Sequence, residues 1–203
     1  MHLAIKQCFG LFCFVCLLLC ILADQEGGGK VLAVKKEKYK SDVSFDPDTA
    51  YPRLIVTPDK KTVKSSSTVQ DVADNPGRFS KNPCVLGSPG FTSGKHYWEV
   101  EYGNSRGWAV GVARNSVKRK NGLSLTQEEG IWQQGLWWAQ QLDLGSHGLP
   151  TGCGKIGVLL DYEGDNMTFY NGNQVTEIKA SFNGEKVFPF FYVGADVSLH
   201  LVP

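Results

Sequence analysis

The chain has 203 residues, of which 42% are hydrophobic and 20% are charged, and this balance indicates a globular rather than a disordered protein. Lysine and arginine number 21 against 20 acidic residues, so the sequence lacks the charge excess that nucleic acids or anionic membranes attract. A binding partner of either kind is therefore not expected. The 23 glycines and 11% aromatic residues favour β-structure with many tight turns.

Residues 1–23 predict a signal peptide. An apolar segment of roughly 14 residues follows Lys6 and ends at Leu22, which is the length of a secretory signal and short for a membrane span. A short membrane anchor is the alternative. We expect cleavage after Ala23, a secreted product and no membrane insertion.

Residues 24–40 predict a linker or a pro-segment. Three consecutive glycines, Gly27 to Gly29, are followed by a lysine-rich stretch that begins at Lys35 and ends at Lys40. Such a stretch is a possible protease-sensitive site, and a solvated N-terminal arm explains it equally well.

From Asp42 onward the sequence predicts short strands separated by turns. Apolar or alternating segments are expected to form strands at residues 43–45, 54–56, 62–63, 84–87, 96–102, 108–113, 156–160, 167–170, 187–193 and 197–202. Strands that recur every roughly 8 to 15 residues, with almost no helical periodicity, are typical of an antiparallel sandwich or barrel. Between residues 127 and 135 we expect no helix.

No group of residues predicts catalysis. Three histidines remain beyond residue 23, at His96, His147 and His200, and no two of them have the spacing of metal ligands. The sequence contains no nucleophile elbow, P-loop or dinucleotide fingerprint. Asp161 and Glu163 precede a predicted hairpin turn, where they more plausibly cap and solvate the turn than act as a carboxylate pair. We therefore expect no enzyme, no metal and no cofactor.

Two cysteines remain beyond the signal peptide. Cys84 opens an apolar segment, whereas Cys153 lies between glycines. A disulfide is possible in a secreted chain, but a domain of this size does not need one. We expect two free thiols.

Tryptophans predict both core and contact positions. Trp98 and Trp108 lie in the most regular strand patterns and are expected in the core, together with Trp132. Adjacent strand residues point to opposite faces, so one of Trp137 and Trp138 should be exposed as an interface anchor. The basic run from Lys118 to Lys120 is interpreted as a solvated loop.

Asn166 begins an N-glycosylation sequon, Asn166-Met167-Thr168, in a predicted hairpin turn. The sequon is a candidate site because a signal peptide would take the chain through the secretory route. A position of Thr168 inside a strand would weaken it.

Several ordered motifs resemble the PRY–SPRY family. They are FDPDTA at residues 45–50, CVLG at 84–87, WEVE at 98–101, GWAVGVA at 107–113 and LDYE at 160–163. The resemblance covers residues 42–203. It implies a bent, jelly-roll-like antiparallel β-sandwich whose ligand surface is built from loops at one edge.

A signal peptide joined to a lone PRY–SPRY domain is similar to the vespryn family of ohanin-like venom toxins. The stretch CVLGSPGFTSGKHYWEVEYG at residues 84–103 carries this similarity. It implies a secreted, non-enzymatic neurotoxin that causes hypolocomotion and hyperalgesia. The alternatives are a butyrophilin-like SPRY protein in immune recognition and a secreted lectin.

The resemblance also implies where the contacts lie. We expect a monomer that binds a protein receptor or channel through loops at Pro58 to Lys61, Arg78 to Asn82, Asn104 to Arg106 and Trp137 to Gln141. The candidate contact residues are Lys60, Lys61, Arg78, Asn104, Arg106, Trp137, Trp138 and Gln141. The alternative is that Trp137 and Trp138 both pack internally and the binding face lies elsewhere.

Overall fold

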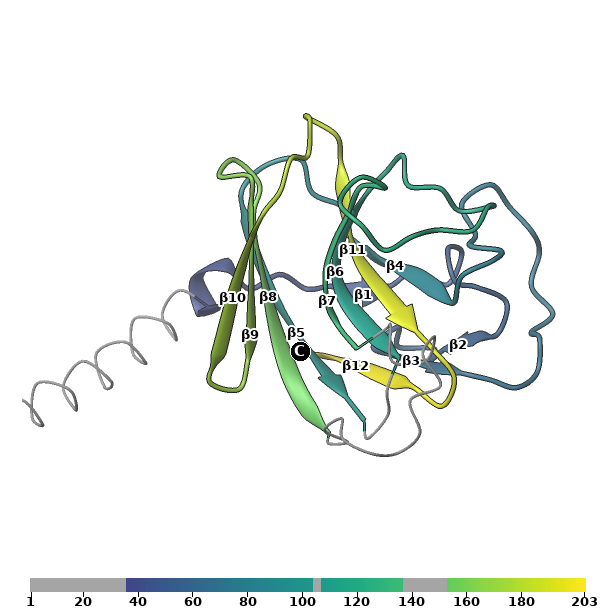
Figure 1. Cartoon of the computed structure of the whole chain (residues 1–203). Coiled ribbons are helices and arrows are strands. Elements are labelled where there is room, and N and C mark those ends of the chain that lie inside the picture. The colour runs from purple at the N-terminus through teal and green to yellow at the C-terminus, as the bar shows by residue number, and fades with distance from the viewer. Residues whose placement is uncertain (1–35, 104–106, 137–152) are drawn as a thin grey trace, which may run out of the picture. The chain divides into compact units, whose positions relative to one another are not determined.

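The computed structural model describes residues 36–103, 107–136 and 153–203, and the chain divides into two units, Met1–Tyr39 and Lys40–Pro203. The described part of the first unit is one helical turn at residues 36–39. The predicted signal peptide and most of the predicted linker lie outside the described residues. The second unit contains the strands (Figure 1).

The strands form two antiparallel sheets, which confirms the predicted all-β fold. The five-stranded sheet has the order β1-β4-β11-β6-β7, with bounds Ser44–Phe45, Cys84–Ser88, Val187–Val193, Trp108–Arg114 and Ile131–Gly135. The seven-stranded sheet has the order β10-β9-β8-β5-β12-β3-β2, with bounds Gln174–Lys179, Asn166–Asn171, Gly154–Asp161, Lys95–Tyr102, Ser198–Val202, Thr62–Ser65 and Leu54–Val56. Chain neighbours such as β5 and β6 therefore lie in different sheets.

The core between the sheets is built from the residues that alternate inward along each strand. Trp98 of β5, Trp108 of β6 and Trp132 of β7 are buried in one hydrophobic cluster, with 2%, 3% and 1% of their surface exposed. Residues of both sheets belong to this cluster, because period-two alternation sends every second side chain to the same face. The predicted core positions of the three tryptophans are confirmed.

A second hydrophobic cluster covers the outer face of the five-stranded sheet. Strand residues such as Leu86, Ala109 and Phe190 meet loop residues that close over them, namely Phe79, Val117, Leu123 and Leu125. Strands β6 and β11 are thus buried on both faces. A strand buried on both faces reads as a continuous apolar run, which is the pattern of WAVGVA and VFPFFYV.

Polar contacts fasten the two covering loops, residues 73–83 and 115–125, to each other. The Asn82 side chain exchanges two hydrogen bonds with the Leu123 backbone, at 3.1 and 2.9 Å, and the Ser80 amide donates to the Arg119 carbonyl at 2.9 Å. The basic run takes part: Lys118 pairs with Glu129, Arg119 donates to the Gly77 carbonyl, and Lys120 pairs with Asp74. These basic side chains tie loops together on the surface.

The structure adds two strands to those expected from the sequence, β7 and β10. Strand β7 covers Ile131–Gly135, inside the segment for which only the absence of a helix was predicted. It forms because Ile131 joins the outer cluster and Trp132 the inner core, while its backbone pairs with β6. The segment Gln133-Gln134-Gly135 has neither apolar alternation nor β-branched residues, so its sequence does not predict a strand.

Both described cysteines are free thiols. Cys84 is fully buried in β4, whereas Cys153 is exposed just before β8. Burial raises the pKa of the Cys84 thiol well above its usual value, because a thiolate would be desolvated there.

Candidate functional site

A pocket of about 250 Å³ opens at one end of the sandwich, where segments distant in the sequence meet. Its walls come from the start of β2, the end of β3, the residue before β4 and the β11–β12 connection. The lining residues are Tyr51, Arg53, Leu54, Ser65, Ser66, Ser67, Pro83, Val193, Gly194, Ala195 and Asp196.

Backbone hydrogen bonds fix these walls. Leu54 pairs with Ser65 in the β2–β3 ladder, and the Ser66 amide donates to the Arg53 carbonyl at 2.8 Å. On the opposite wall the Val193 amide donates to the Pro83 carbonyl at 2.8 Å. The pocket is therefore held by strand ends, which position a site more firmly than free loops do.

The β11–β12 connection is a tight turn. The Val197 amide donates to the Gly194 carbonyl at 3.2 Å, and Asp196 adopts a positive φ of 59°, which Asp tolerates better than most residues. Residues 194–196 of this turn form one wall of the pocket.

The pocket has an apolar floor and a polar rim. Leu54 and Val193 are buried in the inter-sheet core, while Arg53, Ser67 and Asp196 are exposed. An arginine, three serine hydroxyls and a carboxylate supply both donors and acceptors. Such a surface suits an extended polypeptide, whose backbone offers both kinds of group and whose side chains can enter an apolar floor.

The described residues that flank two predicted contact loops are linked by hydrogen bonds to each other and to the pocket residue Gly194. The Gly107 amide donates to the Leu136 carbonyl at 3.1 Å, and the Gly194 amide donates to the Gly107 carbonyl at 2.8 Å. Gly107 follows the segment 104–106 and Leu136 precedes the segment 137–152. The predicted contact residues Asn104, Arg106, Trp137, Trp138 and Gln141 themselves lie outside the described residues.

The Pro58–Lys61 turn lies at the other end of the β2–β3 hairpin. Val56 pairs with Val63 at the turn end, whereas Leu54 pairs with Ser65 at the pocket end. Lys60 is exposed with a positive φ of 58°. The structure therefore does not bring Lys60 and Lys61 together with the pocket residues.

Lys61 is engaged in the fold. Its Nζ donates to Asp42 Oδ1 at 2.6 Å and to the Val43 carbonyl at 2.7 Å. This hydrogen bond and the lysine charge lower the pKa of the Asp42 carboxyl. The contact fastens the start of the domain to the hairpin.

Arg78 differs from the expectation that it contacts a partner. The residue is 5% exposed, and its guanidinium donates to the carbonyls of Ala73, Pro47 and Ala50 at 2.8–2.9 Å. The planar fork of arginine presents several N–H donors, so one guanidinium can bind all three carbonyl oxygens. Arg78 therefore holds the loop that precedes Tyr51 rather than offering its charge to solvent.

Asn166, the glycosylation candidate, is the first residue of β9. Its Oδ1 atom is buried, and Thr168 is a buried strand residue with 5% exposure. The sequon thus begins at the end of the turn and continues into the strand, the arrangement that weakens it as an acceptor.

Sequence reasoning did not find the Arg53, Ser65–Ser67 and Val193–Asp196 walls of the pocket. None of these residues forms a motif. Arg53 and Ser65–Ser67 lie near the beginning of the domain sequence, whereas Val193–Asp196 lie near its end. Only the strand register brings them together. Gly194 is a local sequence signal for the turn between β11 and β12.

Comparisons with known proteins agree with this architecture. The family model described as the SPRY-associated domain PRY matches residues 43–91, and the SPRY domain model matches residues 95–202. The solved TRIM65 PSpry domain superposes with a TM-score of 0.64 over 85% of this chain and 95% of that chain, at 19% identity. These findings define a PRY–SPRY domain.

Two relatives extend over nearly the whole chain. Ohanin of Ophiophagus hannah is 55% identical over 182 residues, which is 89% of this chain and 96% of ohanin. Vespryn of Crotalus adamanteus is 53% identical over 189 residues, which is 92% of this chain and 85% of that protein. The chain belongs to the vespryn family of PRY–SPRY proteins.

Proposed function

We propose that the protein is a secreted, non-enzymatic venom component that acts as a neurotoxin, causing hypolocomotion and hyperalgesia by binding a receptor or channel protein. The observation that carries the proposal is the 55% identity to ohanin over 96% of ohanin's length. The pocket supports it, because an apolar floor with a mixed polar rim is suited to polypeptide recognition.

No helix in residues 36–103, 107–136 or 153–203 is long and apolar enough to cross a membrane. Within the same ranges no group of three or more His, Cys, Asp or Glu side chains could hold a metal ion. The nearly balanced charge of the sequence gives no reason to expect nucleic acid as a partner.

The proposed contact surface is the pocket together with the adjoining segments 104–106 and 137–141. An ordinary protein interface covers about 800 Å² on each partner, so it extends well beyond a pocket of this size. Lys60, one short hairpin away, is proposed as a peripheral contact, and Lys61 is left out because its Nζ already donates to Asp42 and Val43. Arg78 is left out because it is 5% exposed and its Nε and Nη1 atoms already donate to backbone carbonyls.

Binding to neuronal membranes tests the proposal. Arg53→Ala, Arg106→Ala, Trp137→Ala and Trp138→Ala should weaken binding, with folding checked by circular dichroism. Lys186→Ala is the matched control, because Lys186 is an exposed basic residue just before β11, whose far end lines the pocket. If all four variants stay folded and bind like the parent, neither the pocket nor the two predicted contact loops form the site.

Secretion is tested separately. N-terminal sequencing of the product released by secretory cells should show removal of residues 1–23. Recovery of a chain that begins at Met1 in the membrane fraction would contradict it.

A further inference from the structure

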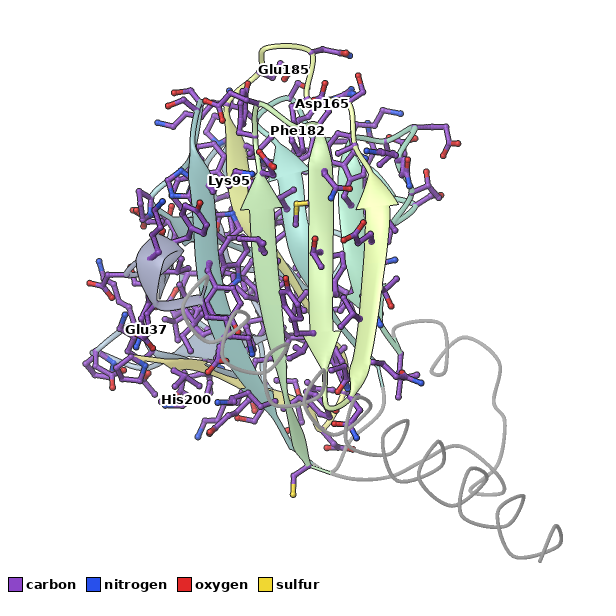
Figure 2. All side chains as sticks on the ribbon, turned by 90° about the vertical axis from the view of Figure 1, so that its left-hand side faces the viewer. Glu37, Lys95, Asp165, Phe182, Glu185 and His200 are labelled. Carbon is purple, nitrogen blue, oxygen red and sulfur yellow. The ribbon has the colours of Figure 1, made fainter. Side chains whose placement is uncertain are left out.

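Among the strands of residues 36–103, 107–136 and 153–203, β10 forms an open edge of the seven-stranded sheet. It is the last strand in the order β10-β9-β8-β5-β12-β3-β2 and lies at the side of the sheet in Figure 1, and Figure 2 looks onto the outer face of that sheet. Five of its six residues are exposed and Ile178 is half-buried. Val175 keeps 56% of its surface in solvent. The edge has neither a proline nor a bulge to block pairing.

The register shows which backbone groups of β10 face the open side. Gln174 pairs with Asn171 across the two-residue turn Gly172-Asn173, and the antiparallel pairs continue to Lys179 with Asn166. In such a hairpin the closing pair is hydrogen-bonded, so the even-numbered residues of β10 bond to β9. The Ala180 amide continues this alternation by donating to the Asp165 carbonyl at 2.8 Å. The amides and carbonyls of Val175, Glu177 and Lys179 therefore point to the open edge.

The outward-facing residues alternate in charge. Glu177 and Lys179 are two residues apart, so their side chains share the outer face of the sheet. When a strand of this kind pairs antiparallel with a copy of itself around Ile178, each Glu177 lies opposite a Lys179. Two opposite-charge pairs and one Ile178–Ile178 pair then form at once.

We propose that β10 is a self-association surface, through which two copies of the protein join their seven-stranded sheets edge to edge with Glu177 of each copy opposite Lys179 of the other. Four intermolecular backbone hydrogen bonds accompany these pairs. Centring the pair on Glu177 would instead set two carboxylates opposite each other, and centring it on Lys179 two ammonium groups, which cross-strand pairing disfavours. The charges thus select one register among the alternatives.

The association is weak and leaves the proposed receptor site open. A six-residue edge buries far less than the roughly 1,200 Å² of a stable specific interface, so the pair forms at high concentration and separates on dilution. Strands β10 and β2 are opposite edges of the sheet, and the pocket lies beside β2 and β3. The expected monomer is then the species that meets a receptor after dilution.

Sedimentation equilibrium of the secreted protein tests the proposal, at concentrations up to on the order of 1 mM because a small interface binds weakly. Glu177→Lys and Lys179→Glu should each weaken self-association by about tenfold or more, since each reversal turns both pairs repulsive. A mixture of the two single variants should form a heterodimer, because all facing charges are then opposite. The double variant E177K/K179E should associate like the parent.

Lys64→Glu is the matched control, because Lys64 is an exposed charge on β3 near the opposite edge of the same sheet. It should leave the dissociation constant unchanged, and circular dichroism confirms that each variant is folded. A parent protein that stays monomeric throughout the range overturns the proposal. So does association that the single reversals do not weaken, or a mixture of the two variants that does not pair.

Discussion

The two outer faces of the sandwich are built differently. On the five-stranded sheet, the loops 73–83 and 115–125 close over a second hydrophobic cluster that includes Phe190. On the seven-stranded sheet, the outer face carries ion pairs between neighbouring strands, such as Lys95 with Asp161 and Lys155 with Glu99. One face is a second core, and the other is a charged surface.

The burial patterns of the strands reflect this difference between the two outer faces. Six residues of β6 are buried in succession, whereas β5 alternates between buried and more exposed residues outside its Tyr97-Trp98 pair. A strand covered on both sides needs apolar residues throughout, and a strand exposed on one side alternates. The long loops therefore serve as structural parts of the PRY–SPRY domain as well as connections.

The largest expected effect on stability comes from replacing a residue that packs under the covering loops. Phe190→Ala should lower the free energy of unfolding by about 3–5 kcal/mol, because a fully buried phenylalanine is lost and a cavity is left. Trp98→Ala and Trp108→Ala, in the inter-sheet core, should cost the same range and serve as benchmarks. Chemical denaturation measures all three. A cost for Phe190→Ala below about 1 kcal/mol, the range for exposed positions, would mean that the outer cluster is not a core.

The second largest expected effect on stability concerns Arg78, a residue of the covering loop 73–83. Arg78→Met should cost about 2–4 kcal/mol, because it removes the hydrogen bonds that the guanidinium donates to the carbonyls of Pro47, Ala50 and Ala73, of which the bond to Ala50 is buried. Arg78→Lys should recover part of the loss, since one ammonium cannot reproduce the planar fork. Equal denaturation midpoints for parent and Arg78→Met would contradict the assigned role.

Substitution of the two cysteines should have smaller effects on stability, and these effects should differ between the two positions. Cys84→Ser should cost about 1–3 kcal/mol by placing a hydroxyl in an apolar cluster, whereas Cys153→Ser at an exposed position should be near neutral. In the native protein a thiol reagent should modify Cys153 alone, because burial raises the pKa of Cys84 and blocks access. In denaturant, two thiols should react. Finding none would show that the cysteines are bonded.

The smallest effect belongs to the charged face. Lys155→Ala should change the free energy of unfolding by less than about 1 kcal/mol, since its ion pair with Glu99 is partly exposed and screened by salt. The change should shrink further at high salt. A loss comparable to that of Phe190→Ala would mean that this face, too, depends on buried structure.

The sequence predicts the strands well where burial leaves a pattern. The continuous run at Trp108 and the alternation around Trp98 identify β6 and β5 with nearly correct bounds. Strand β7 escapes prediction because Gln133, Gln134 and Gly135 belong to neither pattern, and pairing with β6 alone makes them a strand.

The site is less predictable for a different reason. The charge of Arg78 leads to the prediction that it is a solvent-exposed contact residue. The sequence does not show the three backbone carbonyls that its guanidinium binds. The pocket depends on the register that sets Leu54 beside Ser65 and Val193 beside Pro83. No local pattern contains that register.

The most direct test of the account is to ask which surface touches the partner. A photoreactive amino acid is placed at Ser66, on the pocket rim, or at Lys186, just before the start of β11 and away from the pocket, and the protein is irradiated on neuronal membranes. We expect a crosslinked membrane protein from position 66, competed by unlabelled parent protein, and none from position 186. Crosslinking from position 186 alone would contradict it and move the recognition surface to the other end of the sandwich.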